Sequence, residues 1–426
     1  MNTALIFSIV PHLLPAFMIG FVSLLGLILQ KKQGSDVITG TVKATVGVLV
    51  LFAGVDVLSN TITPIAQLFS NVFPGSGTAI AADWTKFLAD YGVAVVLIMV
   101  FGFFVNLLIA RITPFKYVFL TGHILFWNAF MVTAALSDTG KITGIPLIIV
   151  GSIVLGLIST FLPALISKFV FSLTGTKDFT IGHTTTIHSF LGAWVGKVFG
   201  DKSKSLEDIK LPKSMGFLKS MTVSTSIIMF LIYLVMGFVA KPGFAATTFA
   251  GGSQAFWYFW IIFQGLMFAA GLAILLTGVR MMLGEIIPAF HGIAEKIVPE
   301  AVPALDCPMI FPYGENSLAI GFPIAMVFSL ITLVIFGLAG YKYLLLPLVT
   351  AAFFDVGPGV ILANHTGGRR GALIYAALGG ILLIVLEALS LPFVIHTGAG
   401  FLTLFGGNDF SLIAIVVGGI SRLLGL

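Results

Sequence analysis

The chain has 426 residues, of which 58% are hydrophobic and only 9% are charged, and its mean hydropathy is +1.10. Soluble globular proteins carry about 25% charged residues, so this composition excludes a chain that covers itself with a water-facing surface. We attribute the net charge of +5 to basic cytoplasmic loops and expect no nucleic-acid partner. The single cysteine, Cys307, excludes an intrachain disulfide and a multi-cysteine metal site.

Apolar runs recur along the chain at roughly 20 residues, the length that a helix needs to cross a bilayer. They lack the alternation over about 10 residues that is typical of barrel strands. The sequence therefore predicts an all-α polytopic membrane protein with eleven transmembrane helices. In chain order the predicted spans cover residues 7–29, 38–59, 92–110, 117–136, 144–167, 220–240, 257–279, 316–338, 343–364, 371–391 and 410–425.

Basic residues indicate how these spans are oriented. An odd number of spans places the two termini on opposite sides of the membrane. With the N-terminus outside, most basic residues fall in inner loops, and the outer loops hold only Lys86, Lys141, Lys241 and Lys342. Because cytoplasmic loops accumulate lysine and arginine, we expect an outer N-terminus and a cytoplasmic C-terminus.

The chain also repeats part of its pattern. Ala53-Gly54-Val55, followed by Ile62 and Pro64, matches Thr277-Gly278-Val279, followed by Ile286 and Pro288, with each partner 224 positions later (53 to 277, 54 to 278). Five spans separate the two copies, so they have opposite orientation, as in transporters with inverted repeats. We expect a single membrane domain over 1–426 with an inverted repeat at approximately 38–215 and 257–426; chance similarity in an apolar chain is the alternative.

Polar residues at membrane depth are the candidate site. His123 lies in the middle of a predicted span, where a polar side chain is costly unless it meets a partner or a cavity. Asn128 follows five residues later, about 140° away around a helix, so the two share a cavity only if the helix is irregular or the pocket is broad. A histidine satisfied within the core is the alternative.

Two broken segments supply further polar groups. Residues 180–188 are too polar to face lipid and precede an apolar stretch too short to cross, which predicts a re-entrant hairpin with helix breaks that line a cavity. Its His183, Thr184 and Thr185 offer donors and acceptors to a hydroxylated solute. In the second half, Asp355 precedes a Gly-Pro-Gly break, and Asp306 precedes Cys307-Pro308; pairing with arginine to hold helices together is the alternative role for an intramembrane aspartate.

Other chemistries find little support. No His/Asp/Glu cluster shows metal-ligand spacing along the chain, so we expect no metal and no cofactor. The phosphate-binding pattern G-x-x-x-x-G-K-[ST] is absent from the sequence. The hydrophilic segment 200–219 is either a cytoplasmic docking loop or a solvated connector.

Taken together, the motifs resemble those of the membrane subunit, IIC, of the phosphoenolpyruvate-dependent sugar phosphotransferase system (PTS), in the ascorbate-type branch related to the galactitol permeases. The resemblance covers essentially the whole chain. It rests on Thr121-Gly122-His123, Ile181-Gly182-His183, Ala304-Leu305-Asp306-Cys307 and residues 205–212, 278–281 and 363–368.

The resemblance implies a homodimer in the bacterial cell (inner) membrane. Each protomer would have a substrate-holding core domain and a scaffold domain that forms the dimer contact, with membrane lipid around both. A separate IIB protein, phosphorylated on a cysteine, would donate phosphate to the sugar, so the chain itself is a transport subunit and not an enzyme.

The resemblance also assigns site residues. It places His123, His183 and Asp306 in the substrate pocket, with Asp83 and Trp84 near another pocket segment, and Asp306 as a candidate base for the accepting hydroxyl. Ascorbate-specific members have glutamines where this chain has Trp127-Asn128, Thr184-Thr185 and Phe52. These replacements are expected to affect which sugar is bound, and Phe52, Trp84 and Trp127 favour aromatic stacking on a sugar face.

The sequence thus predicts a sugar permease that binds and translocates a small sugar or sugar acid, with ascorbate or a related compound as first candidate, for phosphorylation by IIB. The main alternative is a secondary transporter of a small polar or anionic solute, driven by an ion gradient. A membrane enzyme or channel is a further alternative.

Overall fold

A computed structural model describes residues 16–17, 20–21, 23–28, 30–73, 84–210, 220–241 and 243–425. In this part of the chain, seven helices are long and apolar enough to cross a membrane. They lie in Gly34–Val72, Asp90–Ile112, Gly144–Thr174, Thr222–Val239, Gln254–Gly278, Glu315–Leu338 and Val349–Phe393. The predicted class, an all-α polytopic membrane protein, is confirmed.

Most predicted spans coincide with helices. These are α2 (Gly34–Val72), α3 (Trp84–Ile112), α4 (Gly122–Ser137), α5 (Gly144–Thr174), α7 (Met221–Val239), α9 (Gln254–Ile297), α10 (Glu315–Leu338) and α14 (Asp409–Leu423); the short α8 (Phe244–Phe249) and α13 (Ala399–Phe405) join them. With 16 residues, α4 is shorter than its predicted span because an extended segment precedes it. The first predicted span, 7–29, lies largely outside the described residues.

The predicted spans 343–364 and 371–391 are joined in one folded-back element. After α11 (Val349–Ala351) and the π-helical turn η3 (Ala352–Val356) comes α12 (Gly357–Ser390), which Gly367 (φ −145°) and Gly368 (φ 59°) interrupt. Glycine adopts the left-handed φ of position 368 without steric cost. The chain therefore turns between two helices here, as the two predicted spans require.

A re-entrant element lies beside this turn. Strand β2 (Thr180–Ile181) leads into α6 (Thr186–Phe199), whose 14 residues span about 21 Å, too short to cross the membrane. Helix α6 packs closely on the first half of α12, where a Cβ at Gly192 or Gly196 would collide with the backbone of Gly359 or Ala363. The predicted hairpin is thus a strand followed by a half-length helix.

The sequence analysis did not predict a small sheet. Strands β1 (Tyr117–Phe119), β3 (Val302–Leu305) and β2 form a parallel sheet in the order β1-β3-β2. Strands of two to four residues are too short to show the alternation by which strands are recognised. The sheet joins three segments that are far apart in the sequence.

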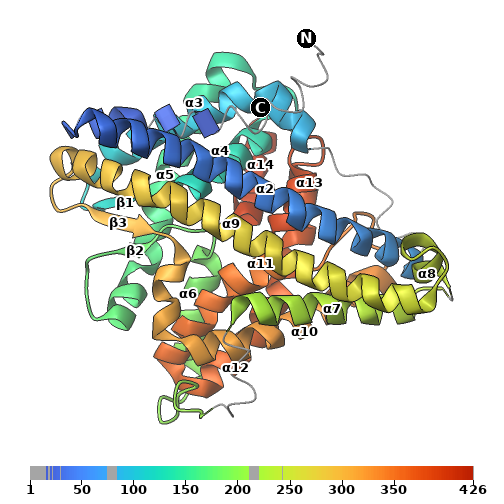
Figure 1. Ribbon diagram of the computed structural model, residues 1–426. Coiled ribbons are helices and arrows are strands. Elements are labelled where there is room, and N and C mark those ends of the chain that lie inside the picture. The colour runs from blue at the N-terminus through green and yellow to red at the C-terminus, as the bar shows by residue number, and fades with distance from the viewer. Residues whose placement is uncertain are drawn as a thin grey trace.

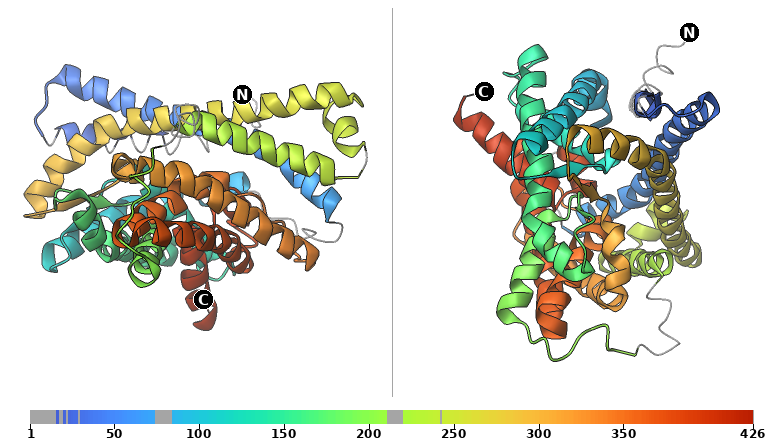
Figure 2. Two further views of the ribbon diagram at one scale, coloured as in Figure 1. Left: turned by 90° about the horizontal axis from the view of Figure 1, so that it is seen from below. Right: turned by 90° about the vertical axis from the view of Figure 1, so that its left-hand side faces the viewer.

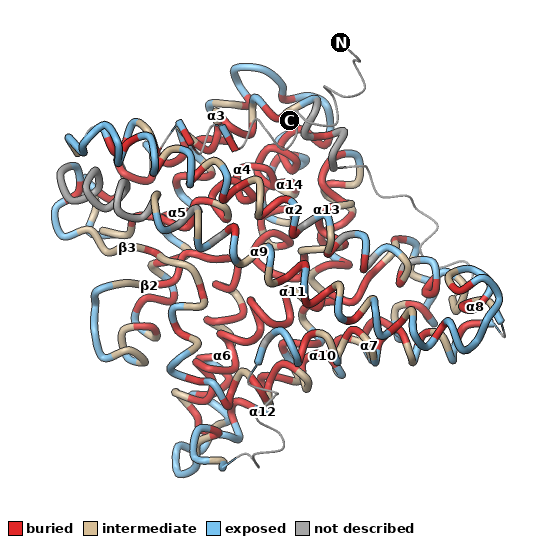
Figure 3. Tube along the Cα trace, viewed as in Figure 1, coloured by how far each residue is buried: buried red, intermediate tan, exposed pale blue. Residues whose placement is uncertain are grey.

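The helices form two layers. In Figure 1 and in the left view of Figure 2, α2, α7 and α9 lie together over the remaining helices. We call α2, α7 and α9 the scaffold layer, and α3, α4, α5, α6, α10, α12 and α14 with the sheet the core layer. Figure 3 shows exposed segments that alternate with buried ones along α7 and α9, and their exposed residues include Phe238 and Phe259. Large exposed apolar side chains of this kind suit contact with lipid.

Helices α2 and α9 run antiparallel and pack along their length (Figure 1). A Cβ at Gly54 would lie 2.8 Å from the carbonyl oxygen of Gly271, and it would collide with the backbone of Leu275. A Cβ at Gly278 would lie 2.6 Å from the carbonyl oxygen of Gly47, and it would collide with the backbone of Leu51. All three correspondences (47 to 271, 51 to 275, 54 to 278) have the offset of 224.

We expect Gly54→Ala to lower the melting temperature of the detergent-solubilised protein, because overpacking of a tight contact costs about 1–3 kcal/mol. Gly284→Ala is the matched control: it lies in the same helix, α9, as Gly278, and no described atom is within 4 Å of its Cβ position. The control should be neutral or stabilising by up to about 1 kcal/mol, the helix-propensity gain of alanine over glycine. Equal melting temperatures for the two variants would contradict the close crossing.

Candidate functional site

The three strands end at the three residues expected to form the site. β1 is followed by Gly122 and His123 in the first turn of α4, β2 by Gly182 and His183, and β3 by Asp306. The amide of Leu120 donates to the carbonyl of Ala304 (3.0 Å), and that of Gly182 to the carbonyl of Leu305 (2.7 Å). Because parallel strands end at one edge of a sheet, these bonds bring the three side chains together.

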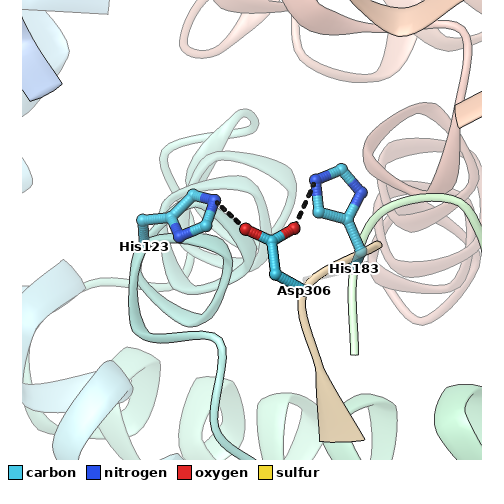
Figure 4. Close-up of side chains that lie close together, drawn as sticks. All are labelled: His123, His183 and Asp306. Carbon is cyan, nitrogen blue, oxygen red and sulfur yellow. Dashed lines mark ion pairs between the residues drawn. The ribbon is translucent and has the colours of Figure 1, made fainter. Parts of the chain in front are cut away.

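The carboxylate of Asp306 lies between the two imidazoles (Figure 4). His123 Nε2 is 3.9 Å from Asp306 Oδ2, and His183 Nε2 is 3.6 Å from Asp306 Oδ1. These contacts are longer than hydrogen bonds. Among the described atoms, His123 Nδ1 and Asp306 Oδ1 are buried without a hydrogen-bond partner, a state that costs about 1–3 kcal/mol per group. A polar ligand between the three side chains would recover that cost.

A second carboxylate, Asp355, supports His183 from the other side. His183 Nδ1 is 3.3 Å from Asp355 Oδ1. The hydroxyl of Thr184 donates to Asp355 Oδ1 (2.6 Å), and the amide of Asn408 donates to Asp355 Oδ2 (2.8 Å). The Thr185 hydroxyl donates to the backbone carbonyl of Asp355 (2.6 Å). Asp355 lies in the π-helical turn η3, a feature frequent at functional sites.

Two residues of the site were not predicted: Asn408, which bonds Asp355, and Asp409, which holds the start of α6. Asp409 accepts from the backbone N–H groups of Thr186 and Ile187 (both 2.9 Å), and its own N–H donates to the carbonyl of Thr184 (3.1 Å). A carboxylate at a helix N-terminus is favoured by the helix dipole. The available signal was Asn-Asp at the start of the last span, a pattern typical of an N-cap; Asn408 does cap α14, accepting from the amide of Phe410.

These side chains line a cavity of about 90 Å³ between the two layers. Its polar wall comes from the core layer and includes His123, His183 and Asp306. Leu51, Leu275 and Leu276 of the scaffold layer face it. The remaining lining residues are Ile124, Trp127, Thr184, Thr350, Ala351, Phe354, Asp355, Phe401, Phe405, Asn408 and Phe410.

The cavity has one polar side and several aromatic rings. Trp127 stacks on Phe401, with ring centroids 4.7 Å apart and an interplanar angle of 25°. Small-ligand sites commonly combine apolar walls with a few placed polar groups. Hydroxyl groups on one edge and an apolar face on the other would match these walls, as in a sugar or sugar lactone.

Several expected site residues lie behind the wall. Phe52 is buried and packs edge-on against Trp127, at 6.0 Å between ring centroids. Thr185 and Asn128 are buried and are not among the lining residues; α4 is a regular helix, so Asn128 points away from His123. Asp83 lies outside the described residues, and only the backbone of Trp84 is described, at the start of α3.

The spacing argument against a metal site did not foresee the convergence of the strands. Donor atoms of His123, His183 and Asp306 all lie within 4.8 Å of one another, so they could surround a metal ion. Residues separated by 60 and more than 100 positions (123, 183, 306) cannot show ligand spacing along a chain. The expectation that the site works without a metal stays a prediction.

We expect Asp409→Ala to destabilise the protein by about 1–3 kcal/mol, because two buried N–H groups at the start of α6 lose their acceptor. A lower melting temperature in detergent would show this. Asp178→Ala, in an exposed loop, is the control and should change stability by less than about 0.5 kcal/mol. If both variants have the same melting temperature, the carboxylate of Asp409 does not stabilise the start of α6.

Two comparisons relate the chain to known proteins. Residues 9–409 match the model of a protein family described as the PTS system sugar-specific permease component. The chain is also 26% identical to a Mycoplasma pneumoniae protein named ascorbate-specific PTS system EIIC component, over 94% of this chain and 68% of the relative.

Proposed function

The chain belongs to the family of PTS sugar-specific permease components, and we propose that it binds its sugar in the cavity around His123, His183 and Asp306. Membership makes it a multi-pass membrane permease and a transport subunit, with a IIB protein as partner and a sugar as substrate. The family does not favour the alternative of transport driven by an ion gradient.

One observation carries the assignment of the site. Two imidazoles face one carboxylate inside a cavity between two layers of helices, and buried polar atoms there are left unpaired. Carboxylates accept hydrogen bonds, and imidazoles donate or accept them, so vicinal hydroxyls are well matched. Asp306 would accept the proton of the hydroxyl that receives phosphate, which requires hydrogen-bond reach of that hydroxyl.

We propose ascorbate, or a related small sugar or sugar acid, as substrate. The Mycoplasma relative is named ascorbate-specific. The stacked Trp127 and Phe401 would face the ring, while Thr184, Asp355 and Asn408 would meet hydroxyl groups or hold His183 in place. Asn128, Thr185 and Phe52 would act from behind the wall by fixing the positions of the lining side chains.

The transport step would use the inverted repeat over approximately 38–215 and 257–426. The reciprocal contacts of Gly54 and Gly278, at the offset of 224, support a local two-fold relation between α2 and α9. Leu51 and Leu275, which correspond under that relation, both line the cavity. Movement of the core layer past these leucines would expose the sugar to one side and then the other.

Three further parts of the proposal come from the family resemblance and from loop charge. The protein forms a homodimer surrounded by membrane lipid. Its N-terminus faces the outside and its C-terminus the cytoplasm, because most loop lysines and arginines then lie inside. The sugar is released inward only after it has been presented to IIB.

Uptake of radiolabelled ascorbate into membrane vesicles, with and without phosphorylated IIB, tests the proposal. We expect phosphorylated ascorbate inside the vesicles, dependent on IIB. IIB-dependent phosphorylation of another sugar would keep the mechanism and reassign the substrate. Unmodified solute that accumulates without IIB would overturn group translocation.

We expect Asp306→Asn to lower IIB-dependent phosphorylation by about 100-fold or more if the carboxylate acts as a base, and His183→Ala to weaken sugar binding. Asp36→Asn, exposed on α2, is the control and should behave as wild type. If both site variants transport and phosphorylate normally, the sugar does not bind at this cluster.

A further inference from the structure

The loop after α6 is tied to the turn of α12. The amide of Asp201 donates to the carbonyl of Gly367 (2.7 Å), and the amide of Arg369 donates to the carbonyl of Lys204 (2.8 Å). Asn364 accepts from the amide of Leu206 (2.9 Å), whose side chain is buried. A free connector would not make these contacts, so residues 201–210 form a fixed part of the core layer, at the lower end in Figure 1.

The same loop also caps α10. Glu207 accepts from the backbone amides of Asn316 (3.0 Å) and Ser317 (2.8 Å), the first turn of that helix. The Asn316 side chain donates back to the carbonyl of Ile209 (3.0 Å). The loop thus fastens the ends of α6 and α10 and the turn of α12 to one another. We call residues 201–210 with the turn at 364–370 the clamp.

The clamp has unbalanced charge on its surface. Lys202, Lys204, Arg369 and Arg370 are exposed, and none of them forms an ion pair with an acidic side chain among the described residues. The acidic groups of the loop are engaged locally, because Asp201 and Asp208 accept from the amides of Ser203 and Ser205 (both 2.9 Å), as Glu207 does from α10. With five basic side chains (Lys202, Lys204, Lys210, Arg369 and Arg370) against three acidic ones (Asp201, Glu207 and Asp208), the clamp carries a net positive charge.

A polar recess opens beside these cations. Its volume is about 280 Å³, and its lining includes the basic Lys202, the acidic Glu207, and the polar Ser205, Asn364 and His365. His365 is oriented by Ser172 Oγ, 2.8 Å from its Nε2. The recess is separate from the sugar cavity: α6 begins next to His183 and ends at the clamp, about 21 Å further along its axis.

We propose that the clamp is the docking surface for the IIB protein, with an acidic segment of IIB seated against the exposed lysines and arginines of the clamp. This inference rests on the proposed function and on the inner placement of these loops that their basic residues predict. Complementary charge steers association and sets orientation. Because the clamp belongs to the core layer, a docked IIB stays with the part of the chain that holds the sugar.

Binding of phosphorylated IIB to the purified permease tests the proposal. Lys202→Glu/Lys204→Glu should weaken binding at least tenfold and reduce its dependence on salt, and Arg369→Glu/Arg370→Glu should do the same. These side chains are exposed, so the fold should tolerate the changes. Lys241→Glu/Lys342→Glu is the control with the same charge change; both lysines are exposed, lie in predicted outer loops, and should leave binding unchanged.

Ascorbate binding to the same samples, measured by thermal shift, separates the possible failures. Docking at the clamp is supported if the clamp variants no longer bind IIB but show the same ascorbate-induced shift in melting temperature as the wild type. Clamp variants that bind IIB as tightly as wild type overturn it. A wild-type protein that binds ascorbate but not phosphorylated IIB would contradict the proposed function itself.

Discussion

The site depends on one constraint: three short parallel strands end side by side, and each delivers one polar side chain to the same point. β1, β2 and β3 share backbone hydrogen bonds, so His123, His183 and Asp306 cannot separate without breaking the sheet. Isolated strands of this length would not be stable. They persist here because the helices of the core layer surround them, and α5 packs against both β1 and β2.

Polar groups at membrane depth are expensive, and the structure handles most of them with hydrogen bonds. Asp355 accepts hydrogen bonds from Thr184 and Asn408 and lies beside His183. Asp409 accepts hydrogen bonds from two backbone amides of α6. The N-terminal end of α6 adds a favourable dipole beside these carboxylates, the arrangement that transporters with broken helices use for charged groups. Among the described residues with unpaired buried polar atoms, His123, Asp306 and Thr350 line the cavity, where a polar ligand would meet them.

Much of this could be predicted from the sequence, for identifiable reasons. Long apolar runs gave α5, α9 and α10, because about 20 apolar residues have few other stable states. The helix break predicted at Gly357-Pro358-Gly359 is wrong, because the backbone stays helical there after the π-helical turn, and the chain turns at Gly367 and Gly368 instead. The sheet could not be predicted, because its strands are too short to show a strand period. The role of Asp409 could not be predicted either, because the α6 amides that it accepts from lie more than 200 positions away in the sequence.

Helix α6 and the first half of α12 connect the two functional ends of the core layer. The start of α6 and the start of α12 meet at the cavity, where Thr184 and Thr185 donate hydrogen bonds to Asp355. The end of α6 and the turn of α12 meet at the clamp, where the amide of Asp201 donates to the carbonyl of Gly367. Glycine contacts between the helices leave little room for sliding, because a Cβ at Gly196 or Gly367 would already collide. Displacement at the clamp must therefore move the cavity wall with it. A partner at the proposed docking surface would gain a mechanical connection to the proposed sugar cavity about 21 Å away, whereas the leucines of α2 and α9 remain with the other layer.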